Sequence, residues 1–134
     1  MFQIDEIKPK IKKIAKRHKF SLVLLFGSQA TGKTHANSDV DIAFVSEKYL
    51  RPSDAAKIQF EISQKLKIKN LELVDLKNAT PLLLNQIAKK SVLLYEKEQS
   101  VFASFKIYGF KRFMEAKDLL KLRDLSLDKF IQKI

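Results

Sequence analysis

Two carboxylates placed two residues apart, Asp39 and Asp41, are the side chains of this sequence best arranged to do chemistry. Side chains alternate between the faces of a strand, so both carboxylates point to one side, with roughly 6.6 Å of backbone rise between them. Val40 and Ile42 then point to the core. Two carboxylates in an apolar strand repel each other unless a cation compensates their charge. Hard cations such as Mg²⁺ take oxygen ligands and often substrate phosphates as well, so the pair predicts a metal site.

Gly27 and Ser28 stand ten residues before Asp39 and directly follow an apolar run. A glycine at this point allows a tight exit from a strand and a close approach of the backbone to a phosphate. The serine adds a hydroxyl and an amide beside it. These residues and the aspartate pair together predict a site for a nucleoside triphosphate and its metal ions.

A second motif overlaps the first. Residues 27–34 match G-x-x-x-x-G-K-[ST], the pattern of a phosphate-binding loop in which Lys33 would reach a phosphate. Such a loop must run directly into a helix. The following residues, His35 to Asp39, have instead the composition of a turn. We therefore favour the Gly-Ser and aspartate arrangement, in which Lys33 is a candidate phosphate contact.

Length, charge and composition limit the classes of protein to consider. The chain has 134 residues, which predicts one domain, and it has no cysteine, which excludes disulfides and cysteine nucleophiles. A formal net charge of +11 favours anionic ligands such as nucleotides, nucleic acid or an acidic protein. No apolar run is long enough for a membrane span, and the first twenty residues lack the apolar stretch of a signal peptide. We expect a cytoplasmic protein with no membrane association.

The elements that must position these residues alternate between helices and strands. Four short apolar runs predict strands, and helical spacing between and around them predicts helices. Pro9 should lie in the first turn of the first helix, which would begin near Lys8. The strands are expected at 21–26, 40–45, 71–76 and 92–95, and the later helices at 52–66, 81–90 and 100–122. This order predicts an α+β fold with a small mixed four-stranded sheet flanked by helices.

The last helix carries more apolar residues than one buried face can hold. Phe102, Phe105 and Gly109 can pack on the body, which would leave Phe110, Phe113 and Met114 partly exposed. Exposed apolar patches of this kind indicate a protein partner. The alternative is a helix buried in a groove or wrapped by residues 126–134. We expect residues 1–98 to form the catalytic domain and 99–134 a helical extension packed on it.

Gly27-Ser28, Gly32 and Ser38-Asp39-Val40-Asp41 resemble the signature of the DNA polymerase β-like nucleotidyltransferase superfamily. The short chain resembles its minimal nucleotidyltransferases, and within these the antitoxins of HEPN/MNT toxin–antitoxin modules. The resemblance extends to about residue 96 and loosely to the last helix. It implies the polymerase β-like fold with an added C-terminal helix.

The resemblance also implies the site residues. Asp39 and Asp41 would bind two Mg²⁺ ions at ATP, with Gly27, Ser28 and Ser38 at the nucleotide. A third carboxylate on a neighbouring strand would complete the metal site and help to deprotonate the acceptor. Glu72 occupies the aligned position, and Asp75 is the alternative; alternation along the strand does not choose between them.

The resemblance implies a function for the chain as well. An antitoxin of this kind would transfer AMP from ATP to a tyrosine hydroxyl of a cognate HEPN ribonuclease toxin, with which it would form a hetero-oligomer. Two alternatives stay open: a nucleotidyltransferase acting on RNA ends or a small molecule, and an antitoxin that acts by binding alone. The net charge of +11 would suit RNA, although no separate RNA-binding module is visible.

Overall fold

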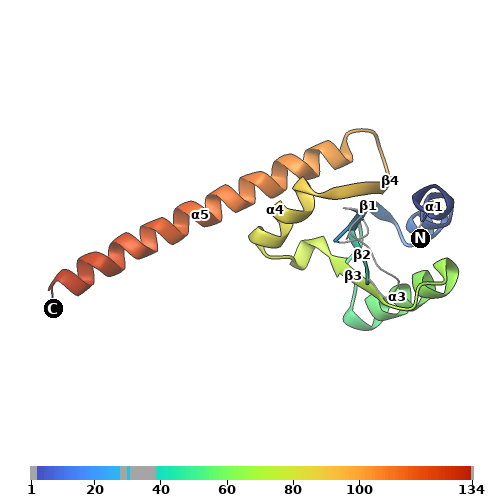
Figure 1. Cartoon of the computed structure of the whole chain (residues 1–134), viewed down its shortest axis with the longest axis horizontal. Helices are drawn as coiled ribbons and strands as arrows, with labels where there is room; N and C mark the ends of the chain where they lie inside the picture. Colours follow the sequence, from blue (N-terminus) through green and yellow to red (C-terminus); the bar gives the residue numbers. More distant parts are fainter. Residues whose placement is uncertain (1–2, 28–29, 31–38, 134) are drawn as a thin grey trace.

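The computed structural model describes residues 3–27, 30 and 39–133. A four-stranded sheet lies between two pairs of helices, and the last helix extends far beyond the body (Figure 1). The elements are α1 (Ile4–Arg17), β1 (Phe20–Phe26), β2 (Val40–Ser46), α3 (Pro52–Leu66), β3 (Leu71–Asp75), the 3₁₀ turn η1 (Leu76–Asn78), α4 (Pro81–Lys89), β4 (Ser91–Glu96) and α5 (Val101–Lys133). The expected α+β fold with a mixed four-stranded sheet is confirmed.

The strand order is β3-β2-β1-β4. β1 pairs antiparallel with both β2 and β4, whereas β2 and β3 are parallel and are joined by α3. A parallel pair requires such a crossover, because the chain must return to the end of the sheet at which it started. As a consequence, β2 and β3 both begin at the end of the sheet at which β1 finishes.

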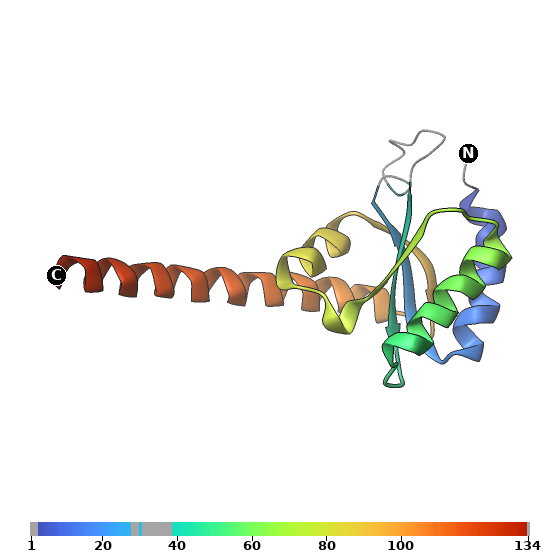
Figure 2. The ribbon, with the colours of Figure 1, turned by 90° about the horizontal axis from the view of Figure 1, so that it is seen from below.

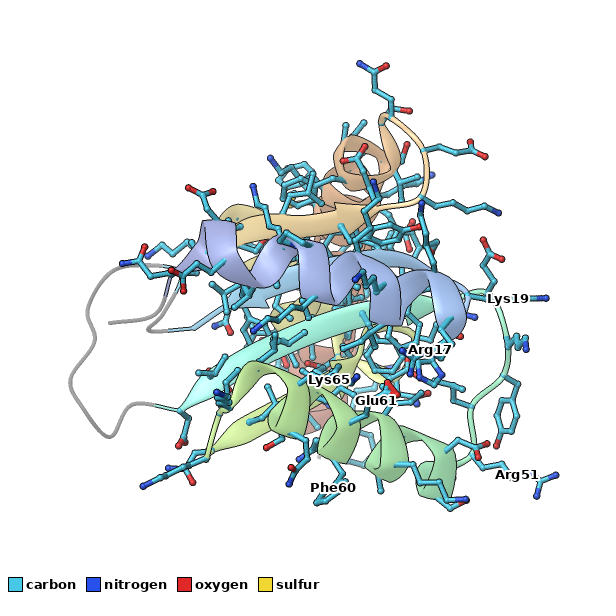
Figure 3. The ribbon with its side chains drawn as sticks, turned by 90° about the vertical axis from the view of Figure 1, so that its right-hand side faces the viewer. Arg17, Lys19, Arg51, Phe60, Glu61 and Lys65 are labelled. Carbon is cyan, nitrogen blue, oxygen red and sulfur yellow. The ribbon has the colours of Figure 1, made fainter. Side chains whose placement is uncertain are left out.

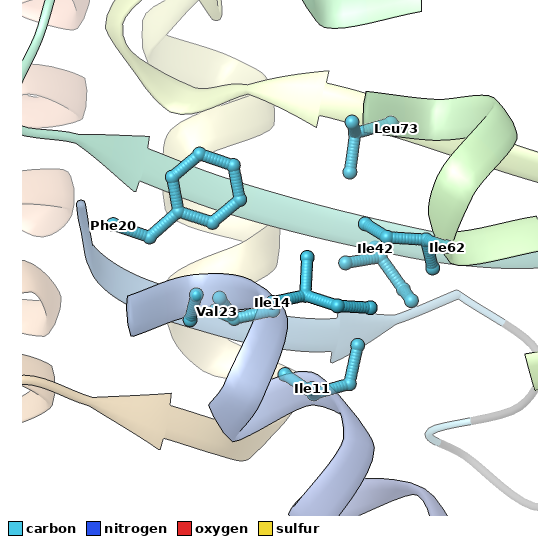
Figure 4. Close-up of a pocket in the computed structure, with 8 residues that line it drawn as sticks. Ile11, Ile14, Phe20, Val23, Ile42, Ile62 and Leu73 are labelled. Carbon is cyan, nitrogen blue, oxygen red and sulfur yellow. The ribbon is translucent and has the colours of Figure 1, made fainter. Parts of the chain in front are cut away.

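One face of the sheet is covered by α1 and α3. Val40, Ile42 and Phe44 of β2 point into this layer, where isoleucines of the two helices meet them. Figure 4 shows the centre of the layer, with Ile11 and Ile14 of α1 facing Ile42 and Ile62. The space among these side chains has no room for a water molecule, so this layer is packed core and not a ligand site.

The opposite face is covered by α4 and the first half of α5. Leu22, Leu24 and Ala43 of the central strands point to this side and contact Leu84 and Phe105 of the helices. α4 begins with Thr80, whose side chain accepts a hydrogen bond from the Leu83 amide, and Pro81 occupies its first turn. The β1 side chains therefore alternate between two separate hydrophobic layers.

Arg17, at the end of α1, contacts Glu61 of α3 (Figure 3). The next residue, His18, also contacts Glu61. His18 Nε2 lies 3.0 Å from Glu61 Oε2. These polar contacts join the two helices at the end of the sheet where β1 begins. They stabilise the layer formed by α1 and α3, at the end of the sheet opposite to the one where β1 finishes.

Two expectations for the helices were wrong. α1 begins at Ile4 and includes Pro9 in its interior, because the buried Ile7 anchors the first turn to the core and outweighs the lost hydrogen bond. α5 continues to Lys133 instead of ending near residue 122, so residues 126–133 prolong the helix and do not wrap it. Beyond Ala116 every described side chain of α5 is exposed, and Figure 2 shows this half projecting from the body. None of the described helices is long and apolar enough to cross a membrane.

Candidate nucleotidyl-transfer site

Asp41 lies at the end of the sheet where β1 finishes and β2 begins. It pairs with Phe26, the last residue of β1, and Asp39 precedes the first residue of β2. Because Ile42 and Phe44 point toward α1 and α3, the alternation of the strand turns Asp41 and Ala43 toward α4 and α5. The Asp41 carboxylate therefore lies on the sheet face covered by α4 and α5.

Glu72 is the cross-strand partner of Asp41 in the parallel pair of β2 and β3. Leu71 and Leu73 pack in the layer of α1 and α3, so the side chain of Glu72 shares the face of Asp41. The sequence alternation alone left the third carboxylate open. The strand register places Glu72 beside Asp41.

Burial and neighbouring negative charge act together on Asp41. Partial burial raises its pKa from 3.8 to about 6, together with the charge of Glu72, a hydrogen bond with Glu72 and the charge of Asp39. Asp39 and Glu72 are both exposed at the rim of the sheet. The three carboxylates therefore form an electronegative corner in which the innermost member resists ionisation.

Asp75, the alternative third carboxylate, caps a turn. It ends β3 and its Oδ1 accepts a hydrogen bond from the Lys77 amide at 3.0 Å, which caps the turn η1. It pairs with Phe44, well along β2 from Asp41. The structure therefore places Asp75 in a turn and apart from the carboxylate corner.

Gly27 follows β1 directly and has a φ of +76°, in the left-handed region that favours glycine. Its α-carbon lies against the Asp41 carboxylate, so any side chain here would collide with that group. The glycine thus brings bare backbone to the carboxylate corner. The three remaining predicted contacts, Ser28, Lys33 and Ser38, lie outside the described residues.

The antiparallel pairing of β1 and β2 also decides between the two overlapping motifs. A phosphate loop followed by a helix leads into a parallel strand through a crossover. An antiparallel neighbour is instead reached by a direct return of the chain. The Gly-Ser and aspartate interpretation therefore fits this sheet, and the phosphate-loop interpretation does not.

The oxygen donors at this corner suit Mg²⁺. No cluster of three or more potential ligands forms among residues 3–27, 30 and 39–133, so the described side chains do not provide a closed cage. Mg²⁺ seldom uses one: it is usually held by one or two carboxylates together with waters and substrate phosphates. Asp41 with either Asp39 or Glu72 would meet that requirement, and a divalent cation would compensate the neighbouring negative charge that, with burial, raises the pKa of Asp41.

The predicted partner residues lie on α5. Phe110 and Met114 are exposed, by 56% and 38%, and stand one helical turn apart. Phe113 is half-buried and lines a cavity between α4 and α5. Phe110 and Met114 thus remain candidates for partner contact, whereas Phe113 belongs partly to the body.

Sequence reasoning missed Asn85, a buried polar residue of α4 that lines the same cavity. The signal was present: Asn85 interrupts the apolar residues of α4, next to the buried Leu84 and Ile87. A polar side chain at such a position needs a hydrogen-bond partner.

Comparison with known proteins agrees with this geometry. Over 84 residues the chain is 34% identical to a protein adenylyltransferase MntA of Shewanella oneidensis, covering 60% of this chain and 58% of that protein's length. It is 29% identical over 121 residues to a protein adenylyltransferase MntA of Aphanizomenon flos-aquae, covering 84% and 81% of the two chains. A crystal structure of a toxin–antitoxin with AMP-PNP matches with a TM-score of 0.73 and 25% identity, over 92% of this chain and 98% of that one.

The model of one protein family, described as polymerase beta, nucleotidyltransferase, matches residues 9–100. This range contains all four strands and every carboxylate of the corner. The chain therefore belongs to the polymerase beta nucleotidyltransferase family.

Proposed function

We propose that this chain is the antitoxin of a two-protein module and transfers AMP from ATP to a tyrosine hydroxyl of a HEPN ribonuclease toxin. The observation that carries the proposal is the register of Asp41 against Glu72, which gathers carboxylates beside the bare backbone of Gly27. The relatives named protein adenylyltransferase support the reaction. The toxin–antitoxin structure with AMP-PNP supports both the nucleotide and the module.

The chain's residues have distinct roles in this reaction. Asp39 and Asp41 would hold the Mg²⁺ ions, which would neutralise charge on the triphosphate. The bare backbone of Gly27 would lie against the phosphates. Glu72 would complete the metal site and would accept the proton of the acceptor hydroxyl. The tyrosine oxygen forms a bond to the α-phosphorus while the bond from that phosphorus to pyrophosphate breaks.

The acceptor protein needs a docking surface beyond the carboxylate corner. Phe110 and Met114 of α5 supply exposed apolar groups near the body, and the projecting half of the helix adds further leucines. Aromatic side chains often dominate the binding energy of protein interfaces. We therefore assign the toxin contact to α5.

The test uses a HEPN toxin, which we expect to be encoded by the adjacent reading frame. The purified toxin is incubated with ATP labelled at the α-phosphate, Mg²⁺ and the chain, and the modified residue is located by mass spectrometry. We expect AMP on a tyrosine and loss of toxin ribonuclease activity. The Asp41→Asn variant should transfer nothing, and the exposed Asp5→Asn variant on α1 is the matched control.

Two results would refute parts of this proposal. Neutralisation of the toxin by Asp41→Asn at the wild-type level would show an antitoxin that acts by binding alone. Label on RNA ends and none on protein would assign the same chemistry to a different acceptor.

A further inference from the structure

One side of α5 is apolar along most of its length. In the first half, Phe105 and Gly109 of this side are buried, and Gly109 lies directly against Leu84 and Ala88 of α4. Figure 2 shows α4 beside this half only, while the second half projects from the body. The side continues past α4 at helical spacing, and we call its residues there the apolar stripe: Phe113, Ala116, Leu120, Leu127 and Ile131.

The projecting part of the stripe has no cover from the described part of its own chain. Leu120, Leu127 and Ile131 are exposed by 52%, 53% and 55%. A helix without tertiary contacts is marginal in water, and a row of exposed apolar side chains marks a contact surface. A second helix laid along the stripe would bury this row and take, in the projecting half, the place that α4 takes in the first half.

Two opposite charges identify the kind of helix that fits the stripe. Lys117 stands four residues after Phe113 of the stripe. Asp124 stands in the same way four residues after Leu120, so both charges flank one edge of the stripe. In an antiparallel pair of identical helices, this edge of one helix meets the same edge of the other. A twofold axis beside Leu120 therefore pairs Lys117 of each copy with Asp124 of the other.

Arg123 decides the direction of the pair. It lies within the width of the stripe, three residues after Leu120 and four before Leu127. A parallel pair of identical helices would place the two Arg123 guanidinium groups against each other, whereas the antiparallel pair places each beside Leu120 of the other copy. There its aliphatic stem can cover apolar surface while its charged end stays in water. The same register brings Phe130 near Arg112 of the other copy, which suits a cation–π contact.

We infer that the projecting halves of α5 from two copies of this chain pair antiparallel and form a homodimer. The interface is isologous, so each contact between different residues occurs twice. The end of each helix reaches Phe113, which lines the cavity of about 720 Å³ between α4 and α5 of the other copy. Phe110 and Met114 lie on another side of α5, so the proposed toxin contact and this pairing do not compete. The inference does not rest on the proposed function.

The test measures the association of the full chain by sedimentation velocity over a range of protein concentrations, without toxin. We expect the wild type to dimerise as its concentration rises. Lys117→Asp and Asp124→Lys each place two pairs of like charges across the interface and should weaken dimerisation by about tenfold. The two changes combined restore opposite charges, so the combined variant should dimerise as the wild type does. A mixture of the two single variants should form a heterodimer for the same reason.

A control and a measurement of orientation complete the design. Asp118→Lys makes the same charge change as Asp124→Lys on the side of α5 away from the stripe, and it should leave dimerisation unchanged. The chain has no cysteine, so a single introduced thiol reports the orientation of the pair. Leu120→Cys lies beside the twofold axis and should form an intermolecular disulfide on mild oxidation. Leu127→Cys should not, because its two copies lie about 20 Å apart in the antiparallel pair.

Four results would overturn the inference: a wild type that stays monomeric, single charge variants that dimerise as the wild type does, a combined variant that stays weakened, and equal crosslinking through Leu120→Cys and Leu127→Cys. A monomeric wild type in which Leu120→Ser with Leu127→Ser weakens toxin binding would assign the stripe to the toxin. AMP transfer by such a monomer would leave the proposed function standing, and dimerisation of a chain that transfers no AMP would do the reverse.

Discussion

A Cβ atom on Gly27 would lie 2.2 Å from the Asp41 carboxylate oxygen Oδ2, which is far inside van der Waals contact. The glycine also has a φ of +76°, where a side chain adds strain. The backbone conformation at the end of β1 and the position of the Asp41 carboxylate at the start of β2 are therefore coupled. A side chain at residue 27 must displace the Asp41 carboxylate.

We expect Gly27→Ala to reduce AMP transfer by about 10²-fold, because a displacement of about 1 Å at a reacting centre has an effect of that size. Gly109→Ala is the matched control. Its Cβ would press on the Leu84 carbonyl oxygen at 3.1 Å and separate α4 from α5 without touching Asp41. Thermal unfolding and single-turnover transfer should thus distinguish the two variants. Gly109→Ala should lower the melting temperature, and Gly27→Ala should lower the rate of AMP transfer more than Gly109→Ala does. Equal transfer by both variants would contradict this coupling.

Asp41→Asn should make the free protein more stable at pH 8. The pKa of Asp41 is raised from 3.8 to about 6, so the folded state favours the protonated carboxyl, and the ionised form destabilises the fold as the pH rises through this window. The asparagine mimics the protonated form. Allowing for partial solvent exposure, the gain above pH 6 should be about 1 kcal/mol and should vanish below pH 4.

Denaturant unfolding at pH 3.5 and pH 8 measures this difference. Mg²⁺ should narrow it at pH 8, because a cation stabilises the wild-type carboxylates and leaves the asparagine variant unaffected. An asparagine variant that is less stable than the wild type at pH 8 without metal would show that the carboxylate corner is not repulsive.

Glu72→Gln should lower AMP transfer far more than Asp75→Asn. Glu72 is in register with Asp41, whereas Asp75 accepts a hydrogen bond from the Lys77 amide and caps a turn. Asp75→Asn should therefore lose up to about 1 kcal/mol of stability and keep most of its activity, as for other caps. Single-turnover rates at saturating ATP decide the ranking, and the reverse order would place the third carboxylate on the other face of β3.

Phe110→Ser combined with Met114→Ser should weaken toxin binding by about tenfold or more, as expected for truncated interface anchors. Both side chains are exposed, so the melting temperature should change little. Phe60→Ser on α3, where the ring is 66% exposed, is the control on the opposite side of the sheet. Unchanged toxin affinity in the double variant would move the interface elsewhere on the chain.

The sequence predicts the strands well because each is a short apolar run with clear ends, and α3 because Pro52 marks its start. The resemblance favours Glu72 over Asp75, but alternation along the strand does not choose between them, since that depends on which face of β3 meets α1 and α3. The pairing of Asp41 with Glu72, a contact between strands, is what puts these two residues side by side. Pairing register is a property of the assembled sheet.

The start of α1 and the length of α5 show two further limits. The preference of proline for the first turn of a helix suggests that α1 starts near Pro9, but the burial of Ile7 favours a start at Ile4. At the other end, the apolar residues of α5 predicted burial or a partner, and the projecting half is a regular helix with exposed side chains. Asn85 was readable as an interruption of an apolar face, although its cavity depends on α5.

The projecting half of α5 has a consequence for the lifetime of the free chain. Helices without tertiary contacts are marginal in water, and such segments open locally at little cost in free energy. A protease should therefore cut the unaccompanied chain beyond Ala116 long before it attacks the sheet, and a bound partner covering this segment should delay the cut. The fraction of the chain that stays uncut would then measure how much of the protein is bound to its partner.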